Sequence, residues 1–422
     1  MPTRTLTILV FLLPGLYVAT AQKRLTIEEC YTLAERNYPL IKQRDLISQA
    51  TQYAVENAAR GWLPQLNIQG QATYQSDVTS IPIKLPGQDI PTPSKDQYKL
   101  YAEVTQVLYD GGNIRLQQQS AQAGEQVELQ KTAVALYQLK ERINQLFFGI
   151  LLLNEQLRQN ELRKSDIQLG LNKAQTAVDN GTALKSSADL LKAEIIQTDQ
   201  HAIELVSARK AYTSMLALFT GTGTDSLELV MPQNTVTATG VGGIHRPELL
   251  LYQEQDKSLD VQRKILSARN RPKLNLFVQG GLGRPALNLL SNDFAGYYIG
   301  GLRLSFPLGG LYTLKNDRET INVSRKNIGV QRDVFLFNTS LAVQQQQEES
   351  NKQQQLLSSD DEIIRLRTSV KNAALLQLEN GVITTNDYLK EVNAADNASQ
   401  NKILHRVQWL LTQYNLQTTT GN

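Results

Sequence analysis

Apolar and polar residues alternate with a period of two in four segments of the chain, and this alternation predicts four β-strands. The predicted strands cover residues 66–76, 97–108, 274–284 and 296–306. Each is roughly 10 residues long, which is the length that a tilted strand needs to cross a bilayer. A soluble amphipathic hairpin gives the same alternation, so the pattern alone leaves both interpretations open.

Two further features of these segments favour the membrane interpretation. The connection from Asp77 to Asp96 is long and contains four prolines, as suits an outward-facing loop. Aromatic residues gather towards the strand ends, as they do in the interfacial girdles of membrane barrels. They are Tyr74, Tyr98, Tyr101, Tyr297, Tyr298 and Phe306.

Four strands are too few to close a barrel. In lipid an open sheet edge leaves backbone N–H and C=O groups without partners, which is very unfavourable. If the strands span a membrane, the chain must therefore oligomerise. Two copies would give about eight strands and little lumen, whereas three would give about twelve, enough for a channel.

A helical period replaces the alternation after each pair of predicted strands. No proline occurs between Asn113 and Val178, so an unbroken helix about 100 Å long is predicted there. The predicted helical hairpins cover residues 113–220 and 313–417, and the second has a weaker seam with glutamine-rich tracts. The heptad seam of the first hairpin predicts helices packed side by side. It consists of Leu136, Leu139, Ile143, Leu146, Ile150, Leu153 and Leu157.

The chain contains an internal duplication. Three sequence motifs of residues 59–192 recur in the same order about 200 residues later. They are Ala59-Arg60 with Pro64-Gln65-Leu66, recurring as Ala268-Arg269 with Pro272-Lys273-Leu274; Leu108-Tyr109-Asp110-Gly111-Gly112, recurring as Phe306-Pro307-Leu308-Gly309-Gly310; and Asn180-Gly181, recurring as Asn380-Gly381. The predicted repeats are residues 22–222 and 245–422, joined by a connector, 223–244, at the side of the helices. Each repeat is predicted as helix, strand, loop, strand, long helix, turn and helix.

The N-terminus has the features of a cleavable signal peptide covering residues 1–21. Arg4 precedes an apolar stretch from Leu6 to Val18, and Ala19-Thr20-Ala21 matches the small-x-small cleavage pattern. Cys30 is the only cysteine and lies nine positions beyond this site, so the mature chain is not expected to be a lipoprotein. It is predicted to be a small apolar residue of the first helix.

Composition and motifs argue against catalysis and nucleic-acid binding. The net charge is only +3, so no basic field points to nucleic acid. The three histidines lie singly, without metal-ligand spacing, and the glycine-rich run 280–283 lies inside a predicted strand. We therefore predict no catalytic residue, no metal site and no cofactor.

The duplicated plan, the Ala-Arg-x-x-x-Pro-x-Leu junction, the Leu-Tyr-Asp-Gly-Gly strand exit and the Asn-Gly turns together resemble the TolC-like outer-membrane efflux protein family. The resemblance covers essentially the whole mature chain. It implies a mainly α fold with a membrane β-barrel: a homotrimer with a twelve-stranded barrel in the outer membrane, continuous with an α-helical barrel in the periplasm. It also implies passive export, with the helical tips docked onto a periplasmic adaptor and an inner-membrane pump.

The same resemblance suggests site residues at the hairpin tips. Family members carry acidic side chains around a narrow pore at the tip, and the matching position here is Asp387. Lys390 stands where a second acid can occur, and at a spacing of i,i+3 it could partly neutralise Asp387. Asp189 is taken as the counterpart in the first repeat; both aspartates could equally be helix-start residues favoured by the helix dipole. The expected adaptor contacts are Asn180, Gly181, Thr182, Asn380, Gly381 and Val382.

A soluble periplasmic coiled-coil adaptor or scaffold is the alternative function. It would explain the helical hairpins and the signal peptide. It would not explain four strand-length alternations at matching places in a duplicated chain. A simple porin is a poorer alternative, because its sequence would be mostly strands.

Overall fold

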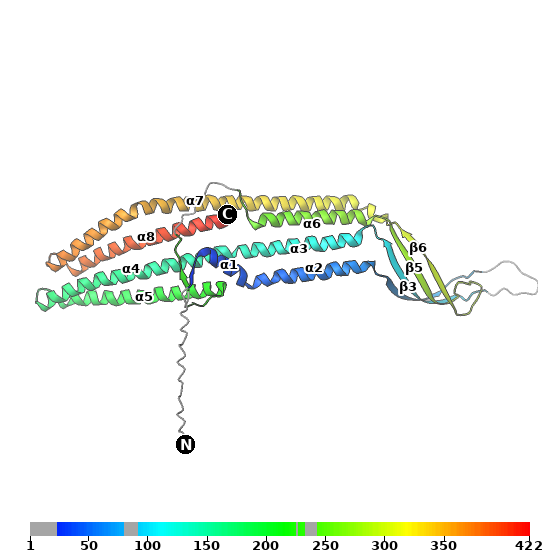
Figure 1. The fold of residues 1–422 in the computed structure, drawn as a ribbon, viewed down its shortest axis with the longest axis horizontal. Coiled ribbons are helices and arrows are strands. Elements are labelled where there is room, and N and C mark those ends of the chain that lie inside the picture. Colours follow the sequence, from blue (N-terminus) through cyan, green and yellow to red (C-terminus); the bar gives the residue numbers. More distant parts are fainter. Residues whose placement is uncertain (1–22, 80–91, 225–226, 233–242) are drawn as a thin grey trace, which may run out of the picture.

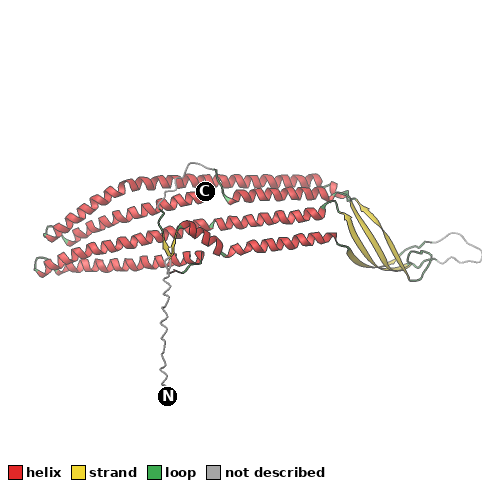
Figure 2. Ribbon diagram, viewed as in Figure 1, coloured by secondary structure: helices red, strands yellow, loops and turns green. Residues whose placement is uncertain are grey.

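The computed structural model describes residues 23–79, 92–224, 227–232 and 243–422. Long helices run from a four-stranded sheet at one end of the molecule to two tight turns at the other (Figures 1 and 2). The predicted signal peptide lies outside the described residues, as does much of the predicted connector. The predicted order of elements in each repeat is confirmed.

The elements have the following bounds, given in chain order. They are β1 (Lys23–Leu25), α1 (Ile27–Asn37), the 3-10 turn η1 (Pro39–Lys42), α2 (Gln43–Ala59), β2 (Gln65–Tyr74), β3 (Asp96–Tyr109), α3 (Asn113–Tyr137), α4 (Leu139–Asp179), α5 (Lys185–Thr220), β4 (Leu227–Leu229), α6 (Pro247–Arg269), β5 (Lys273–Arg284), β6 (Ala295–Ser305), α7 (Leu314–Glu379) and α8 (Thr385–Thr420).

The four long strands form one antiparallel sheet in the order β2-β3-β5-β6. Their ends lie close to the predicted ones. β3 pairs with β5, for example Val104 with Val278, so the sheet is continuous across the two repeats. Within the described residues, the outer strands β2 and β6 each have a neighbouring strand on one side only, so no described strand pairs with their other edges.

The helices form a wall that repeats the order of the strands (Figure 1). Near the sheet the neighbours are α2, α3, α6 and α7; towards the tips they are α5, α4, α8 and α7. Hydrogen bonds join helix ends in the middle of the wall. The side-chain amide of Asn37, the last residue of α1, donates to the carbonyl of Thr220, the last residue of α5. The N–H of His245, which lies just before α6, donates over 2.7 Å to the carbonyl of Thr420, the last residue of α8. The wall therefore has two lateral edges, α2 with α5 on one side and α7 on the other.

The prediction of one unbroken helix from Asn113 to Val178 is wrong at a single position. α3 ends at Tyr137 and α4 begins at Leu139. Gln138 keeps right-handed helical backbone angles, and its N–H still donates to the Val134 carbonyl over 3.2 Å. The break is therefore a local irregularity, and neither a proline nor a glycine marks it in the sequence.

The start of the chain fits the predictions from its helix signals. Thr26 and Glu29 form a capping box, and a 3-10 turn that starts at Pro39 separates α1 from α2. Cys30 is fully buried in α1, and its burial raises the pKa of the thiol to about 12. Its role is therefore packing, as predicted.

Two apolar clusters hold the wall together. The larger cluster unites α1, α4 and α8 around Phe147, Phe148 and Ile143, near the ends of α5 and α8. The smaller lies towards the tips and joins α4 to α7 and α8 around Ile167 and Tyr388. Beside the larger cluster, β1 pairs in parallel with β4, a contact that the sequence did not predict.

The glutamine-rich tract of α7 is helical and forms specific contacts. Gln353 is buried, and its side-chain amide donates to the Gln408 carbonyl oxygen over 3.0 Å. Gln413 donates to the Ser350 hydroxyl over 2.6 Å. Polar side chains therefore join α7 to α8 where apolar residues would do so in an ordinary coiled coil.

Candidate functional site

Both hairpins end in the same glycine turn, far from the sheet (Figure 1). Gly181 and Gly381 have φ of 71° and 70°, a left-handed conformation that favours glycine. Beyond them the Thr182 N–H donates to the Ala177 carbonyl, and the Val382 N–H donates to the Gln377 carbonyl, each over 2.8 Å. These are Schellman turns, so both tips are fixed and project into solvent.

The remaining predicted tip residues also lie in these turns. Asn180 and Asn380 end helices α4 and α7, and the Asn380 side-chain amide donates to the Leu376 carbonyl over 2.8 Å. Val382 is 70% exposed. An exposed apolar side chain on a rigid turn is a feature that a binding partner can use.

Asp387 and Lys390 lie about one turn apart at the start of α8. The Lys390 ammonium is 3.2 Å from Oδ1 of Asp387. Oδ2 accepts hydrogen bonds from the Thr384 hydroxyl over 2.7 Å and from the Thr384 N–H over 3.3 Å. The Asp387 N–H in turn donates to the Thr384 hydroxyl, which completes a capping box. Asp387 therefore helps to cap the start of α8 and is paired with a neutralising cation as well.

The hydrogen bonds from Thr384 and the nearby Lys390 ammonium lower the pKa of Asp387 below its ordinary value of 3.8. A carboxyl with a lowered pKa in the folded state stabilises the fold above its unfolded pKa. That contribution is lost as the pH falls through the lower, folded-state pKa. The cap therefore stays intact throughout the neutral and mildly acidic range.

Asp189 occupies a different place in its helix. It is the fifth residue of α5, whereas Asp387 is the third residue of α8. Its carboxylate lies 4.0 Å from the Lys192 ammonium. The capping of α5 uses no side chain, because Leu184 precedes it. The structure thus pairs each aspartate with a lysine of its own helix.

The residue after Asp387 joins the two hairpins. Tyr388 is 1% exposed, packs against Gly170 of α4 and donates its hydroxyl to the Asp166 carbonyl over 2.7 Å. A Cβ at Gly170 would lie 2.3 Å from the Tyr388 ring. Sequence reasoning did not single out Tyr388; the signal was the isolated glycine inside a long helix, which often marks close packing.

Replacing Gly170 with alanine should therefore loosen the tip. Overpacking of this kind destabilises by about 1–3 kcal/mol, which outweighs the gain of about 1 kcal/mol from removing a helical glycine. Gly124→Ala is the matched control, because no atom lies within 4 Å of a Cβ there. Thermal unfolding should show a lower Tm for Gly170→Ala and an unchanged or higher Tm for Gly124→Ala. Equal stabilisation of both would contradict the contact with Tyr388.

Two ion pairs reinforce the link between the hairpins near the tips. Lys371 of α7 lies 2.6 Å from the Asp166 carboxylate of α4, and Lys173 of α4 lies 2.6 Å from Glu379 of α7. The pair of Lys371 and Asp166 is largely shielded from solvent, whereas that of Lys173 and Glu379 is exposed. The buried pair therefore contributes more to the position of the second hairpin.

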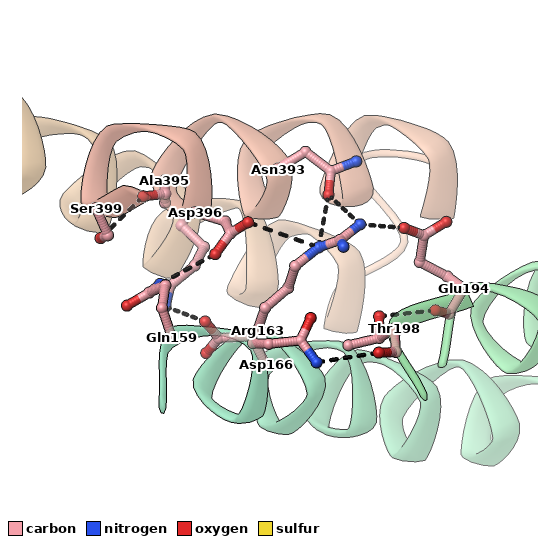
Figure 3. A network of polar contacts seen from close by, with 11 residues as sticks. Gln159, Arg163, Asp166, Glu194, Thr198, Asn393, Ala395, Asp396 and Ser399 are labelled. Carbon is pink, nitrogen blue, oxygen red and sulfur yellow. Dashed lines mark hydrogen bonds and ion pairs between the residues drawn. The ribbon is translucent and has the colours of Figure 1, made fainter. Parts of the chain in front are cut away.

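Further from the tips, Arg163 joins three helices (Figure 3). Its guanidinium forms an ion pair with Glu194 of α5, and both side chains are under 20% exposed. It also donates to the Asn393 side-chain oxygen of α8 over 3.0 and 3.2 Å. Asp396 of α8 lies 3.9 Å away and accepts a hydrogen bond from Gln159 over 3.1 Å.

One guanidinium thus faces two carboxylates that are largely shielded from solvent in this network. Burial raises the pKa of Asp396, although the Gln159 hydrogen bond and the charge of Arg163 act in the opposite direction. Arg163 is the cation that makes the burial of both carboxylates tolerable.

The sheet has one apolar and one polar face. The registers place even-numbered residues on one face: Leu66 opposite Val104, Val104 opposite Val278 and Leu276 opposite Leu302. Large apolar side chains on this face are exposed in the single chain: Leu66, Ile68, Leu100, Val278, Leu282, Leu302 and Leu304 are each 52–73% exposed. The face has no partner within the described residues.

The odd-numbered face is polar. Arg303 forms a two-pronged ion pair with Glu103 over 3.1 and 3.2 Å, and Tyr101 donates to Gln69 over 2.5 Å. Gln279 donates to the Tyr297 hydroxyl over 3.1 Å. The prediction that Tyr101 and Tyr297 belong to a lipid-facing girdle is therefore wrong, because both share the polar face.

Neither catalytic nor metal-binding geometry stands out in the part of the chain that the structure describes. No group of three or more His, Cys, Asp or Glu side chains there could hold a metal ion. His405 contacts the Asp360 carboxylate over 2.8 Å as a bridge between α7 and α8. Among the described helices, none combines the length and apolar composition needed to cross a membrane.

Comparisons with known proteins match this chain by structure only. No protein-family model and no curated protein sequence matches it. The outer membrane protein VceC of Vibrio cholerae superposes with a TM-score of 0.66 at 15% identity, over 94% of this chain and 96% of VceC. The CmeC outer membrane channel of Campylobacter jejuni gives 0.63 at 10% identity, over 100% and 94%.

The open state of the MtrE outer membrane channel of Neisseria gonorrhoeae gives a TM-score of 0.62 at 12% identity. That superposition covers 99% of this chain and 98% of MtrE, so the likeness extends to the sheet, the helical wall and the tips together. The chain has the fold of the TolC-like outer-membrane channels.

Proposed function

We propose that three copies of this chain form a passive export duct of the outer membrane, with a shared twelve-stranded β-barrel and a helical barrel in the periplasm. One observation carries the proposal: a sheet with a bare apolar face, a polar opposite face and two free edges. Water would face a continuous apolar surface on the isolated chain, which soluble proteins avoid. Lipid outside and an aqueous lumen inside suit the two faces.

The free strand edges support a closed ring of copies. β2 and β6 run antiparallel to each other, since each neighbouring pair in the sheet is antiparallel. The β6 of one copy can therefore pair with the β2 of the next in the same way as the other strands. Such a head-to-tail contact closes into a ring, and a closed barrel leaves no unpaired edge in lipid.

The lateral helix edges also fit each other. Exposed apolar side chains follow α7 in two runs with spacings of three, four or seven, separated by the glutamine-rich tract. The first run consists of Val323, Val330, Val334, Phe337 and Leu341, and the second of Ile363, Leu366 and Val370. The opposite edge carries a groove of about 630 Å³ near the end of α5, lined by Tyr38, Tyr212, Met215, Leu218 and Phe219 among others. These apolar runs and an apolar groove on opposite edges suit contact between successive copies.

The tips are the proposed docking surface for a periplasmic adaptor and an inner-membrane pump. Both turns are rigid, exposed and distant from the sheet, and they include Val382 and Leu184, which are 70% and 76% exposed. A signal peptide would direct export of the chain to the envelope, and its cleavage after Ala21 would release the mature protein. In this proposal the duct is passive, and a pump would supply the energy for export.

The alternative function, a soluble periplasmic adaptor, conflicts with the sheet. An adaptor in water would have to cover the apolar face, and no described segment of the chain lies on it. Its outer strands would also be exposed to edge-to-edge aggregation.

Disulfide cross-linking tests the order of copies. Leu218 of α5 is 84% and Leu341 of α7 is 53% exposed, and both lie near the level where α5 and α8 end. In isolated envelopes, the double variant Leu218→Cys/Leu341→Cys should give cross-linked species of two and three chains on a non-reducing gel. No ladder of larger cross-linked species should appear. Buried Cys30 need not be removed.

The control is Leu218→Cys/Val370→Cys. Val370 lies in the second apolar run of α7, about 40 Å further along the helix than Leu341, at 1.5 Å per residue. It should not cross-link to Leu218. A ladder that continues beyond three chains, or equal cross-linking in both variants, would contradict the closed trimer.

The tip ion pair yields a prediction about ion selectivity. Lys390→Gln removes the cation that neutralises Asp387, so each tip becomes more acidic while the Thr384 cap remains. The cation-to-anion permeability ratio of channels in planar bilayers should rise severalfold, and the stability should hardly change. Asp387→Asn/Lys390→Gln, which restores neutrality, should return the ratio to that of the unaltered protein. An unaltered ratio in Lys390→Gln would exclude these residues from the conducting path.

A further inference from the structure

The loop between β5 and β6, residues 285–294, exposes large apolar side chains at the end of the sheet far from the helices (Figure 1). Leu287, Leu289 and Phe294 are 58%, 53% and 63% exposed, and Leu290 is 38% exposed. Four such residues within eight positions form a patch rather than scattered surface leucines. The patch has no partner among the described residues.

Hydrogen bonds hold this loop in place. The Asn292 side chain accepts from the Ser94 N–H over 2.6 Å and donates to the Thr92 carbonyl over 2.9 Å. Asn288 accepts from the Leu290 N–H over 3.1 Å through its side chain, and from the Ser291 N–H over 3.2 Å through its carbonyl. The loop therefore presents its leucines as a fixed surface.

Aromatic contacts show on which side of the sheet the loop lies. The Phe294 ring centroid is 6.3 Å from that of Tyr98, and the Arg284 guanidinium lies 5.2 Å from Tyr98 and 5.5 Å from Phe294. Tyr98 belongs to the apolar face, in register with Ala72 and Arg284. Phe294 therefore continues that face at its outer end.

We propose that loop 285–294 is a membrane anchor whose leucines enter the outer leaflet at the boundary between acyl chains and headgroups. The inference rests on the proposed duct, in which the apolar face meets lipid. Apolar side chains beside Tyr98 and Phe294, next to the Arg284 and Asp96 ion pair, match the chemistry of that boundary. Its continuity with the apolar face selects lipid as the occupant over a neighbouring copy.

Single-tryptophan fluorescence of the full assembled protein tests this placement. Trp62→Phe/Trp409→Phe provides the background, and one tryptophan is returned at Leu289, at Val278 on the apolar face, or at Gln71 on the polar face. The proteins are placed in phosphatidylcholine vesicles with acyl chains brominated near the headgroup or near the chain end, and iodide is the aqueous quencher. The loop tryptophan should be quenched best by bromine near the headgroup, that at Val278 by deeper bromine, and that at Gln71 by iodide alone.

The controls separate failure of the anchor from failure of the duct. If lipid quenches the tryptophan at position 278 but only iodide quenches that at 289, the anchor is wrong and the duct stands. If neither quencher reaches position 289, the loop packs on another copy and the anchor is also wrong. If lipid quenches neither position, the proposed function itself is contradicted.

Discussion

Arginine at position 278 should prevent assembly of this protein in the outer membrane, whereas arginine at position 279 should be tolerated. Val278 lies on the apolar face between Val104 and Gly300, and Gln279 lies next to it on the polar face beside Glu103. A lipid-facing arginine near the bilayer midplane costs about 2–4 kcal/mol. In a trimer the cost arises three times, once in each copy.

The measurement is the amount of heat-resistant oligomer in isolated outer membranes. Val278→Arg should leave little or none, with the chain degraded or aggregated, and Gln279→Arg should give a near-normal amount. The two positions share their depth and strand, so only the face differs. Equal assembly of both variants would mean that the apolar face does not meet lipid.

Replacing Arg163 with methionine should cause a large loss of stability in the helical wall. The change leaves the mostly shielded carboxylates of Glu194 and Asp396 without their shared cation. Removal of one partner from a buried ion pair costs about 3–5 kcal/mol. Lys164→Met is the matched control, because Lys164 is the next residue and its pair with Asp199 is exposed. Chemical unfolding should show a large change for Arg163→Met and little for Lys164→Met.

The pH dependence of this variant follows from the raised pKa of Asp396. A carboxyl whose pKa is higher in the folded state binds its proton more tightly there, so acidification stabilises the fold and a rising pH destabilises it. The charge of Arg163 acts to lower the pKa of Asp396, so its removal should raise that pKa further, and the stability deficit of Arg163→Met should be smaller at about pH 5 than at about pH 8. A deficit that is larger at the lower pH would show that the carboxylates are not buried as described.

The faces of the sheet could be predicted from sequence, because the alternation of residues fixes them. The parity of position 101 already groups Tyr101 with Lys99 and Glu103, so its assignment to the lipid-facing girdle overrode the better signal. Counting aromatics near strand ends ignores the face from which each one projects. The odd or even position of a residue along its strand should be considered first, because it determines the face from which the side chain projects.

The arrangement of the repeats could not be predicted in the same way. The pairing of β3 with β5 joins residues about 180 positions apart, and no local period encodes it. β1 and β4 have three residues each, too few for an alternation to be recognised. Both pairings depend on the tertiary fold.

The candidate site was only partly accessible from sequence. The resemblance pointed to Asp387, while the local pattern Thr384-x-x-Asp387 indicates a cap, and the structure has that cap. Tyr388 and Arg163 were missed, since their partners on other helices lie between 31 and 230 positions away. A buried contact between residues so far apart in the sequence leaves a sequence signal only when it requires an unusual residue, as it does at Gly170.

The mass of the protein extracted from outer membranes in mild detergent, corrected for bound detergent, tests the central claim most directly. A shared barrel requires a complex of three chains that stays in solution only with detergent. A single chain that is soluble without detergent would contradict the shared barrel and favour the periplasmic coiled-coil adaptor.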